Sequence, residues 1–400
     1  MANPKRKQFQ TAPGASTPKA KEKAEENSGL RARSRTKKDS IMKRHTDMNT
    51  EALYSDAVAL LRDLIRIPSP SREEAGTAER LAAFLSDSGI ETHRKKNNVW
   101  AFNRHYDPAK PTILLNSHHD TVRPNSGYTR DPYDPAIEGD RLYGLGSNDA
   151  GASGVSLLAA FRHFYDREEM KYNLCVAITA EEENSGSDGL ECVLPELGPL
   201  DFAIVGEPTQ MQLAIAERGL MVVDCTARGR SGHAAREEGD NAIYKAMQDI
   251  EWFRSYRFPK VSELFGAVKM TVTIISAGTQ HNVVPAECRF TVDIRVTDRY
   301  TNEEVLDEIR RHVRSEVAPR STRLKPSSIP PAHPIVRAGL ALGRTTYGSP
   351  TTSDQALLDI PSLKLGVGDS ARSHSADEFV GLSEIREGID LYIRMLSAIL

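Results

Sequence analysis

The chain has 400 residues, which is enough for two domains of ordinary size. Its 39% hydrophobic and 27% charged residues are typical of a globular protein, and no apolar run approaches the ~20 residues that a membrane-spanning helix needs. Four scattered cysteines with no CxxC pair favour reduced structural thiols, so we expect a cytoplasmic protein with no membrane association.

The net charge of −3 hides a basic head. Residues 1–48 hold 13 Lys and Arg against five Asp and Glu, a balance of +8, so the remainder carries −11. This head has almost no large apolar residues and lacks the apolar segment of a secretory signal, so we expect it to be disordered. A nucleic-acid-binding tail is disfavoured, because nothing downstream offers a matching basic or aromatic face. The alternative is a start assigned too early, with Met42 or Met48 as the true first residue.

The next part of the chain alternates helices with short apolar strands. Apolar residues at helical spacing predict one helix from Glu51 to just before Pro68 and a second helix over 76–88. A third helix is expected over 153–164. Buried strands are predicted at Thr112–Leu115, Leu174–Ile178 and Phe202–Val205. This alternation indicates an α/β fold with a central, largely parallel sheet flanked by helices.

The middle of the chain has a different pattern. The predicted order is strand, helix, strand, strand, helix and strand, which is typical of a ferredoxin-like α+β domain. The expected elements are a strand at 222–227, a helix at 241–253, strands at 268–276 and 289–296, a helix at 302–317 and a strand near 322–328. We interpret this segment as a domain inserted into the first.

The α/β pattern then resumes with a helix at 335–344, a strand at Leu363–Leu365 and a closing helix at 382–400. The predicted organisation has four parts. They are the head at 1–48, the first part of the catalytic domain at 49–217, an inserted lid and dimerisation domain at 218–328, and the second part of the catalytic domain at 329–400.

Acids and histidines follow the predicted strands of the central sheet. His118 and Asp120 follow the first strand, three consecutive glutamates start at Glu181 after the second, and Glu207 follows the third. His374 comes soon after the last strand. In open α/β sheets, ligands bind beyond the carboxyl ends of the strands. Clustered carboxylates repel one another unless cations lie between them, and His with Asp or Glu suits zinc, manganese or cobalt.

The order of these motifs resembles the zinc hydrolase family of acetylornithine deacetylase, succinyl-diaminopimelate desuccinylase and carboxypeptidase G. The matching segments are SHHDTV (117–122), GSNDAG (146–151), TAEEENSG (179–186), VGEP (205–208), RGRSGHAA (228–235), QHNVVP (280–285) and GDSARSHSADE (368–378). The resemblance runs from about residue 50 to the C-terminus, and the acetylornithine deacetylase-like members are the closest.

The resemblance implies a two-metal centre, with zinc as the expected ion and cobalt as the alternative. The implied metal ligands are His118, Asp149, Glu183, Glu207 and His374, with Asp149 bridging the two ions. Asp120 would orient His118. His233 of the inserted domain would stabilise the oxyanion, often in the neighbouring subunit's site, so a homodimer is expected.

The run of three glutamates leaves the general base to be assigned. The family has two acids here, and aligning Thr179-Ala180-Glu181 with its Thr-Ala/Ser-Asp makes Glu182 the base and Glu183 the ligand. We expect His119, next to His118 in an extended strand, to point away and to be packed or hydrogen-bonded.

The implied substrate is a small N-acyl amino acid. Asn282 and Arg295 match family positions that hold a substrate carboxylate, and a guanidinium binds a carboxylate in a bidentate manner. Thr352 and Ser353 belong to a desuccinylase-like TSD pattern, whereas the sequence after His374 resembles the deacetylase pattern. N-acetylornithine is the preferred substrate, and an N-acyl-citrulline, an N-succinyl amino acid or a dipeptide is the alternative. A metal-binding scaffold without catalysis is the non-enzyme alternative.

Overall fold

The structure, a computed structural model, describes residues 50–400 of the chain. The expectations for the basic head, residues 1–48, lie outside the described residues. Leu53–Leu400 form one compact unit, and the described part of the chain begins with a helix over 50–65. In the part of the chain that the structure describes, no helix combines the length and apolar character needed to span a bilayer.

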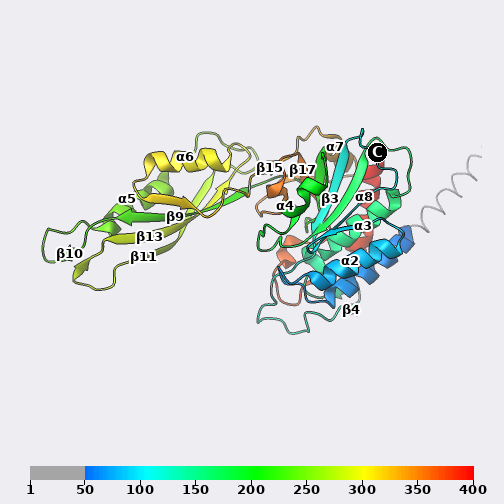
Figure 1. Cartoon of the computed structure of the whole chain (residues 1–400), viewed down its shortest axis with the longest axis horizontal. Helices are drawn as coiled ribbons and strands as arrows, with labels where there is room; N and C mark the ends of the chain where they lie inside the picture. The colour runs from blue at the N-terminus through cyan, green and yellow to red at the C-terminus, as the bar shows by residue number, and fades with distance from the viewer. Residues whose placement is uncertain (1–49) are drawn as a thin grey trace, which may run out of the picture. The chain divides into compact units, whose positions relative to one another are not determined.

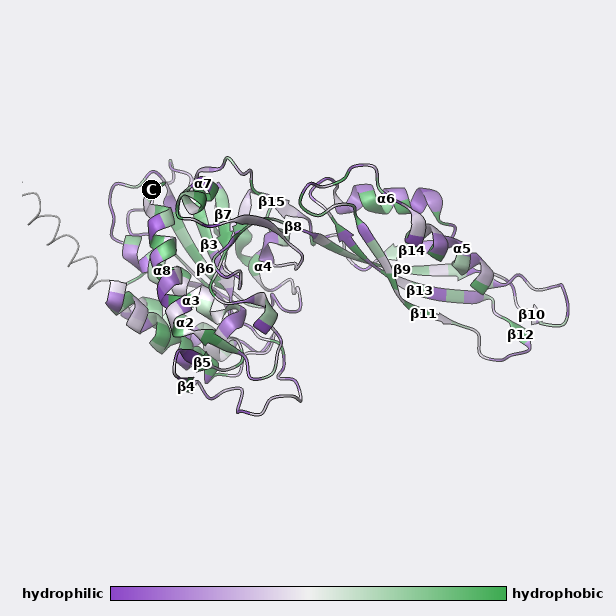
Figure 2. Ribbon diagram, turned by 180° about the vertical axis from the view of Figure 1, so that it is seen from behind, coloured by the Kyte–Doolittle hydropathy of each residue, from purple (hydrophilic) through white to green (hydrophobic). Residues whose placement is uncertain are grey.

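A nine-stranded sheet forms the centre of the fold (Figure 1). Its core is the parallel trio β6 (Asn173–Thr179), β3 (Thr112–His118) and β7 (Phe202–Val205), and β17 (Ser362–Lys364) pairs parallel with β7. Every residue of these four strands is buried. The largely green colour of β3, β6 and β7 in Figure 2 agrees with strands covered on both faces. The predicted α/β class with a largely parallel sheet is therefore confirmed.

Shorter strands extend this sheet on both sides. The sheet order is β1-β2-β6-β3-β7-β17-β8-β15, with β16 also paired to β8. The added strands are β1 (His93–Lys95), β2 (Asn98–Phe102), β8 (Leu213–Glu217), β15 (Ser327–Ser328) and β16 (Thr346–Ser349). A separate small sheet contains β4 (Ile137–Glu138), β5 (Arg141–Tyr143) and β18 (Phe379–Gly381).

Amphipathic helices cover the sheet and share one large core with it. The predicted helices of this domain are confirmed, with bounds that differ by a few residues. They are α2 (Ala75–Asp87), α3 (Ala152–Phe164), α7 (Pro334–Ala341) and α8 (Leu382–Ser397). A further short helix, α4 (Leu190–Val193), precedes β7 in the chain. Almost all of α3 is buried because α8 packs against it while its other face lies on the strands.

The inserted segment forms its own antiparallel sheet with a separate core. In chain order its main elements are β9 (Gly219–Arg228), α5 (Ala242–Ser255), β11 (Lys269–Ala277), β13 (Glu287–Val296), α6 (Asn302–His312) and β14 (Glu316–Pro319). The sheet order is β11-β13-β9-β14. Residues of β9 alternate between buried and half-buried, as expected for a strand with helices on one face. This arrangement confirms the predicted ferredoxin-like domain.

The end of the inserted domain differs from the prediction. The helix expected over 302–317 ends at His312, and the strand expected near 322–328 lies earlier, as β14. Val313 and Val317 continue the helical spacing of Ile309, which explains the error. The helix ends because the buried carboxylate of Asp249 accepts the backbone N–H groups of Arg314 and Ser315 instead. Part of 322–328 forms β15, which pairs with β8 in the central sheet.

A buried ion pair links two neighbouring strands of the central sheet, β17 and β8. The Lys364 Nζ of β17 lies 2.6 Å from the Glu217 Oε2 of β8, and both side chains are almost fully buried. The other Glu217 oxygen accepts the backbone N–H of Ser353, and Nζ also donates to the Ser349 hydroxyl. Burial disfavours the ammonium, but the carboxylates of Glu217 and Glu207 hold the pKa of Lys364 above its usual value.

We expect Lys364→Met to lower the free energy of unfolding by about 3–5 kcal/mol, because it leaves the Glu217 charge buried without a cation. Urea denaturation measures this change. The double variant Lys364→Met, Glu217→Gln should recover part of the loss. Lys325→Met is the control, since its ion pair with Asp359 is exposed and should contribute no more than about 1 kcal/mol. A loss in Lys364→Met no greater than that of the control would contradict the role of this pair.

Candidate metal centre

The carboxyl ends of four strands bring the predicted ligands into one region. His118 is the last residue of β3, while Glu182 and Glu183 follow β6 and Glu207 follows β7. Because these strands are parallel neighbours, their ends meet at the same edge of the sheet. His374 approaches from the segment after β17, and Asp149 lies in the turn that precedes α3.

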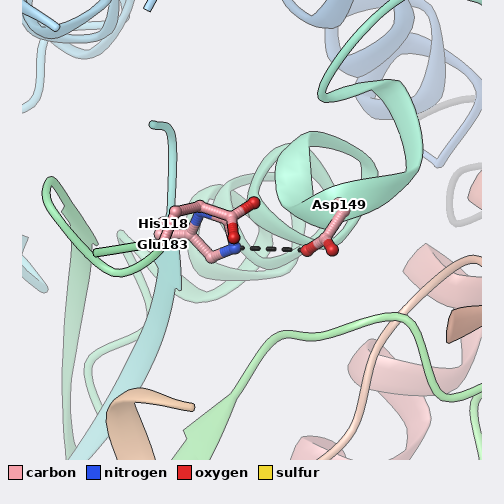
Figure 3. A group of neighbouring side chains, drawn as sticks. All are labelled: His118, Asp149 and Glu183. Carbon is pink, nitrogen blue, oxygen red and sulfur yellow. Dashed lines mark hydrogen bonds and ion pairs between the residues drawn. The ribbon is translucent and has the colours of Figure 1, made fainter. Parts of the chain in front are cut away.

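Asp149 lies between the two histidines. The His118 Nε2 is 3.3 Å from Asp149 Oδ1, a contact drawn in Figure 3, and the His374 Nε2 is 3.6 Å from Asp149 Oδ2. The two oxygens of one carboxylate therefore face two different imidazoles. This arrangement is compatible with the bridging role predicted for Asp149.

Glutamates complete the two sides of the cluster. On one side, the His118 Nε2 lies 3.7 Å from the Glu207 Oε1 and 4.0 Å from the Glu182 Oε2. On the other, the His374 Nε2 lies 3.0 Å from the Glu183 Oε2. Ligand atoms come within 4.8 Å of one another in two sets of three residues, His118 with Asp149 and Glu183, and His118 with Glu182 and Glu207.

The electrostatics of the site fit cations. Burial raises the pKa of Glu207 to about 8 and raises the pKa of Glu182 well above its usual range. The Oε1 atom of Glu207 is buried and has no hydrogen-bond partner among the described residues. A buried carboxylate oxygen without a donor is costly, and a divalent cation would stabilise it. The residues present therefore fit a pair of metal ions.

The pKa values of the two histidines reflect the same crowding of carboxylates. Burial opposes a charge on His118, but hydrogen bonds with Asp120 and Asp149 hold the pKa of this histidine well above its usual value. The hydrogen bond with Glu183 raises the pKa of His374 to about 9. Each imidazole faces carboxylates that favour a positive charge beside them, and a cation between the imidazole nitrogen and these carboxylates would supply that charge.

Asp120 supports the cluster from behind. Its carboxylate is fully buried, and Oδ1 lies 3.4 Å from the Nδ1 of His118. The same carboxylate accepts the backbone N–H groups of Glu182 and Glu183 at 3.1 Å each, and the Ser71 hydroxyl at 2.7 Å. Asp120 thus contacts the ring of the predicted ligand His118 and fixes the backbone of the predicted base Glu182 and of the predicted ligand Glu183.

His119 points away from the cluster, as predicted. It is buried, its Nδ1 is 2.8 Å from the Thr77 hydroxyl, and its Nε2 is 2.8 Å from the Asn97 carbonyl oxygen. Both ring nitrogens are therefore occupied by hydrogen bonds within the fold. Burial lowers the pKa of His119, which favours the neutral ring and agrees with a packing role.

A cavity of about 270 Å³ opens beside the cluster. Glu182, Glu183 and Glu207 line one side of it, and Thr352 lies on the loop that lines the other. Ser353 is also on this loop, but its hydroxyl donates to the buried Glu217 at 2.7 Å. The structure thus places Thr352 at the cavity and Ser353 in the support of its wall.

The other predicted site residues lie on the inserted domain. His233 is exposed on the two-residue strand β10 (Gly232–His233), which pairs with β12 (Val283–Val284). Its Nδ1 accepts the N–H of Ala235 at 3.1 Å. Asn282 is exposed just before β12, and Arg295 on β13 pairs with Asp293 of its own strand at 2.9 Å. The roles assigned to these three residues stay predictions.

Sequence reasoning missed three buried charges around the cluster: Asp354, Lys364 and Glu378. Asp354 accepts the Thr179 hydroxyl at 2.9 Å, and burial raises its pKa to about 6. The signals in the sequence were a lysine inside an apolar strand and two acids within motifs already identified, Asp354 in TSD and Glu378 in GDSARSHSADE. A residue type at a given position in the sequence does not show which way its side chain points in the fold.

Comparison with known proteins supports the geometry. Residues 215–321, which include the main elements of the inserted domain, match the model of the M20 peptidase dimerisation domain. The chain is 30% identical over 280 residues to succinyl-diaminopimelate desuccinylase 2 of a Ruegeria species, a match that covers 65% of this chain and 70% of the relative.

Solved structures show the same fold at low sequence identity. Aminopeptidase PepT from Bacillus cereus superposes with a TM-score of 0.71 at 18% identity, covering 86% of this chain and 98% of that one. A dinuclear metal-binding peptidase of the M20 family from Bacillus subtilis gives a TM-score of 0.68 at 17% identity, with coverages of 87% and 98%. The sequence match and the arrangement of acids and histidines lead to one conclusion: the chain belongs to the M20 family of metal-dependent peptidases and amide hydrolases.

Proposed function

We propose that this protein hydrolyses the amide bond of an N-acyl amino acid at a two-metal centre, with Glu182 as the general base. The observation that carries the proposal is the position of Glu182. Its carboxyl lines the cavity within 4.0 Å of His118, next to the carboxylates that fit the metals. Burial raises its pKa, which is the direction that a base working near neutral pH requires.

The residues divide into two ligand sets around Asp149. His118 and Glu207 would hold one ion, and Glu183 and His374 the other, with zinc preferred and cobalt as the alternative. Two such ions polarise a carbonyl and lower the pKa of water. Glu182 would take the proton from that water and return it to the leaving amine. His233 is proposed to donate to the oxyanion.

The acyl group defines two candidate substrates. The order of motifs near His374 favours an acetyl group, as on N-acetylornithine, which would place the protein in arginine biosynthesis. The relative from Ruegeria is named for removal of a succinyl group, which favours an N-succinyl amino acid. In both cases the substrate carries a carboxylate, for which Arg295 and Asn282 of the inserted domain and Thr352 at the cavity are the proposed contacts.

We also propose that the protein forms a homodimer through the inserted domain. Its strand β11 is at the edge of the four-stranded sheet, where backbone groups can pair with another chain. Ile274 and Ile275 on this strand are more than half exposed, as are Tyr244 and Met247 on α5. Large apolar side chains beside an unpaired strand edge favour a protein interface.

The substrate proposal predicts hydrolysis of an N-acyl amino acid that depends on metal. We expect turnover of N-acetylornithine or of an N-succinyl amino acid with added zinc or cobalt, and its loss in the presence of a chelator. A panel of N-acetyl, N-succinyl and dipeptide substrates measures kcat/KM for each class. If the metal-loaded protein hydrolyses none of them, the proposed function is wrong.

The three consecutive glutamates predict three different phenotypes. Glu182→Gln should reduce kcat by about 10²–10⁴-fold with metal content unchanged, because only the base is lost. Glu183→Gln should lose metal. Glu181→Gln is the matched control, since its carboxylate faces Arg72 at 4.0 Å, and it should keep both activity and metal. Metal analysis and steady-state kinetics separate these outcomes, and loss of metal from Glu182→Gln would make Glu182 a ligand instead.

The dimer proposal predicts that charges on the β11 edge produce monomers. Light scattering of the wild-type protein should give twice the chain mass of 44.2 kDa. The double variant Ile274→Arg, Ile275→Arg should give the mass of one chain, because burying two unpaired guanidinium groups is unfavourable. Leu340→Arg serves as the control, since Leu340 is an exposed apolar residue on α7 of the catalytic domain. A dimer that persists in the double variant argues for another interface.

A further inference from the structure

Glu378 is a buried acid next to the cluster, and its carboxylate contacts the backbone of Asp149. It is only 2% exposed. Its Oε1 accepts the backbone N–H groups of Asn148 at 2.8 Å and of Asp149 at 2.9 Å, and its Oε2 accepts the N–H of Gly146 at 3.1 Å. One buried carboxylate therefore satisfies three backbone donors of the turn that carries the bridging aspartate.

The turn needs these bonds because of its shape. Gly146 has a φ of 76°, in the left-handed region that favours glycine, and this turns the following N–H groups toward the interior. Buried N–H groups without an acceptor cost about 1–3 kcal/mol each. Asn148 fixes the other side of the turn through its side chain, which exchanges two hydrogen bonds with the backbone of Asp369.

The segment that carries Glu378 also carries His374. Between them, Asp377 accepts the backbone N–H groups of Thr129 at 2.9 Å and of Arg130 at 3.0 Å, which fixes this segment to a second loop. His374 and Asp149 come from distant parts of the chain, yet their ligand atoms lie 3.6 Å apart. Glu378 joins the two by holding the backbone of Asp149 four residues after His374.

We propose that Glu378 is a positioning residue for the two-metal centre, which sets the position of the bridging Asp149 relative to His374. The inference rests on the proposed metal centre. Asp149 reaches both histidines only while its backbone keeps the conformation of this turn. A change in that conformation would therefore affect the binding of both ions at once. Outer carboxylates of this kind change metal affinity by about 10- to 100-fold when they are removed.

The experiment compares metal affinity in three variants of the full chain. Apo-protein is titrated with Zn²⁺ or Co²⁺ by calorimetry, and circular dichroism and thermal unfolding monitor the fold. Glu378→Gln keeps the volume, but its amide can accept at only one atom. Asp249→Asn is the matched control, because Asp249 is 4% exposed and its carboxylate accepts the N–H groups of Arg314 and Ser315 in the inserted domain. Glu378→Asp keeps the charge but shortens the reach.

We expect Glu378→Gln to bind metal about 10- to 100-fold more weakly than the wild type, while Asp249→Asn loses stability but keeps wild-type affinity. If Glu378→Gln does not fold, Glu378→Asp decides, with an expected smaller loss of affinity. Wild-type affinity in the folded Glu378 variant, or an equal loss of affinity in Asp249→Asn, overturns the positioning role. A wild-type protein that binds no metal overturns the proposed function as well, which separates the two failures.

Discussion

Several carboxylates meet at one edge of the central sheet and repel one another. The rest of the site is built around the need to compensate this negative charge. Asp149, Glu182, Glu183 and Glu207 all line one cavity, and the first and last are within 4 Å of the same imidazole nitrogen. Such groups in a poorly solvated site cannot all be ionised without compensating positive charge. Burial, and after it the neighbouring carboxylates, raises the pKa values of Glu182 and Glu207, and two divalent cations would offset both effects.

A second set of buried acids holds the first in place through the backbone. Asp120 accepts the N–H groups of Glu182 and Glu183, and Glu378 accepts that of Asp149. Carboxylates accept several N–H bonds well because each oxygen has two lone pairs, and such bonds stabilise the ionised form. The ligands therefore keep their positions through main-chain contacts, which do not compete with the ligand oxygens for metal.

Strand periodicity and topology could predict that His118, Glu182 and Glu207 meet at one edge of the sheet, whereas their roles at a metal centre were implied by the resemblance to a family. Apolar runs such as Phe202–Val205 predict buried parallel strands, and residues directly after them must meet at one edge. The same reasoning fails at Lys364, since a charge in an apolar strand carries no information about its partner. It also fails after Ile309, where Val313 and Val317 keep a helical spacing although Asp249 ends the helix.

Side-chain direction is the other quantity that the sequence does not contain. Thr352 and Ser353 are adjacent and chemically alike, yet one lies at the cavity and the other donates to Glu217 beneath it. The charges that line the cavity also depend on which side chains point into it. The four cavity carboxylates carry four negative charges, which two divalent ions match, and Lys364 is already neutralised by Glu217. Lys364 therefore offers little net positive charge to a substrate carboxylate, which favours the proposed contacts with Arg295 and Asn282 of the inserted domain.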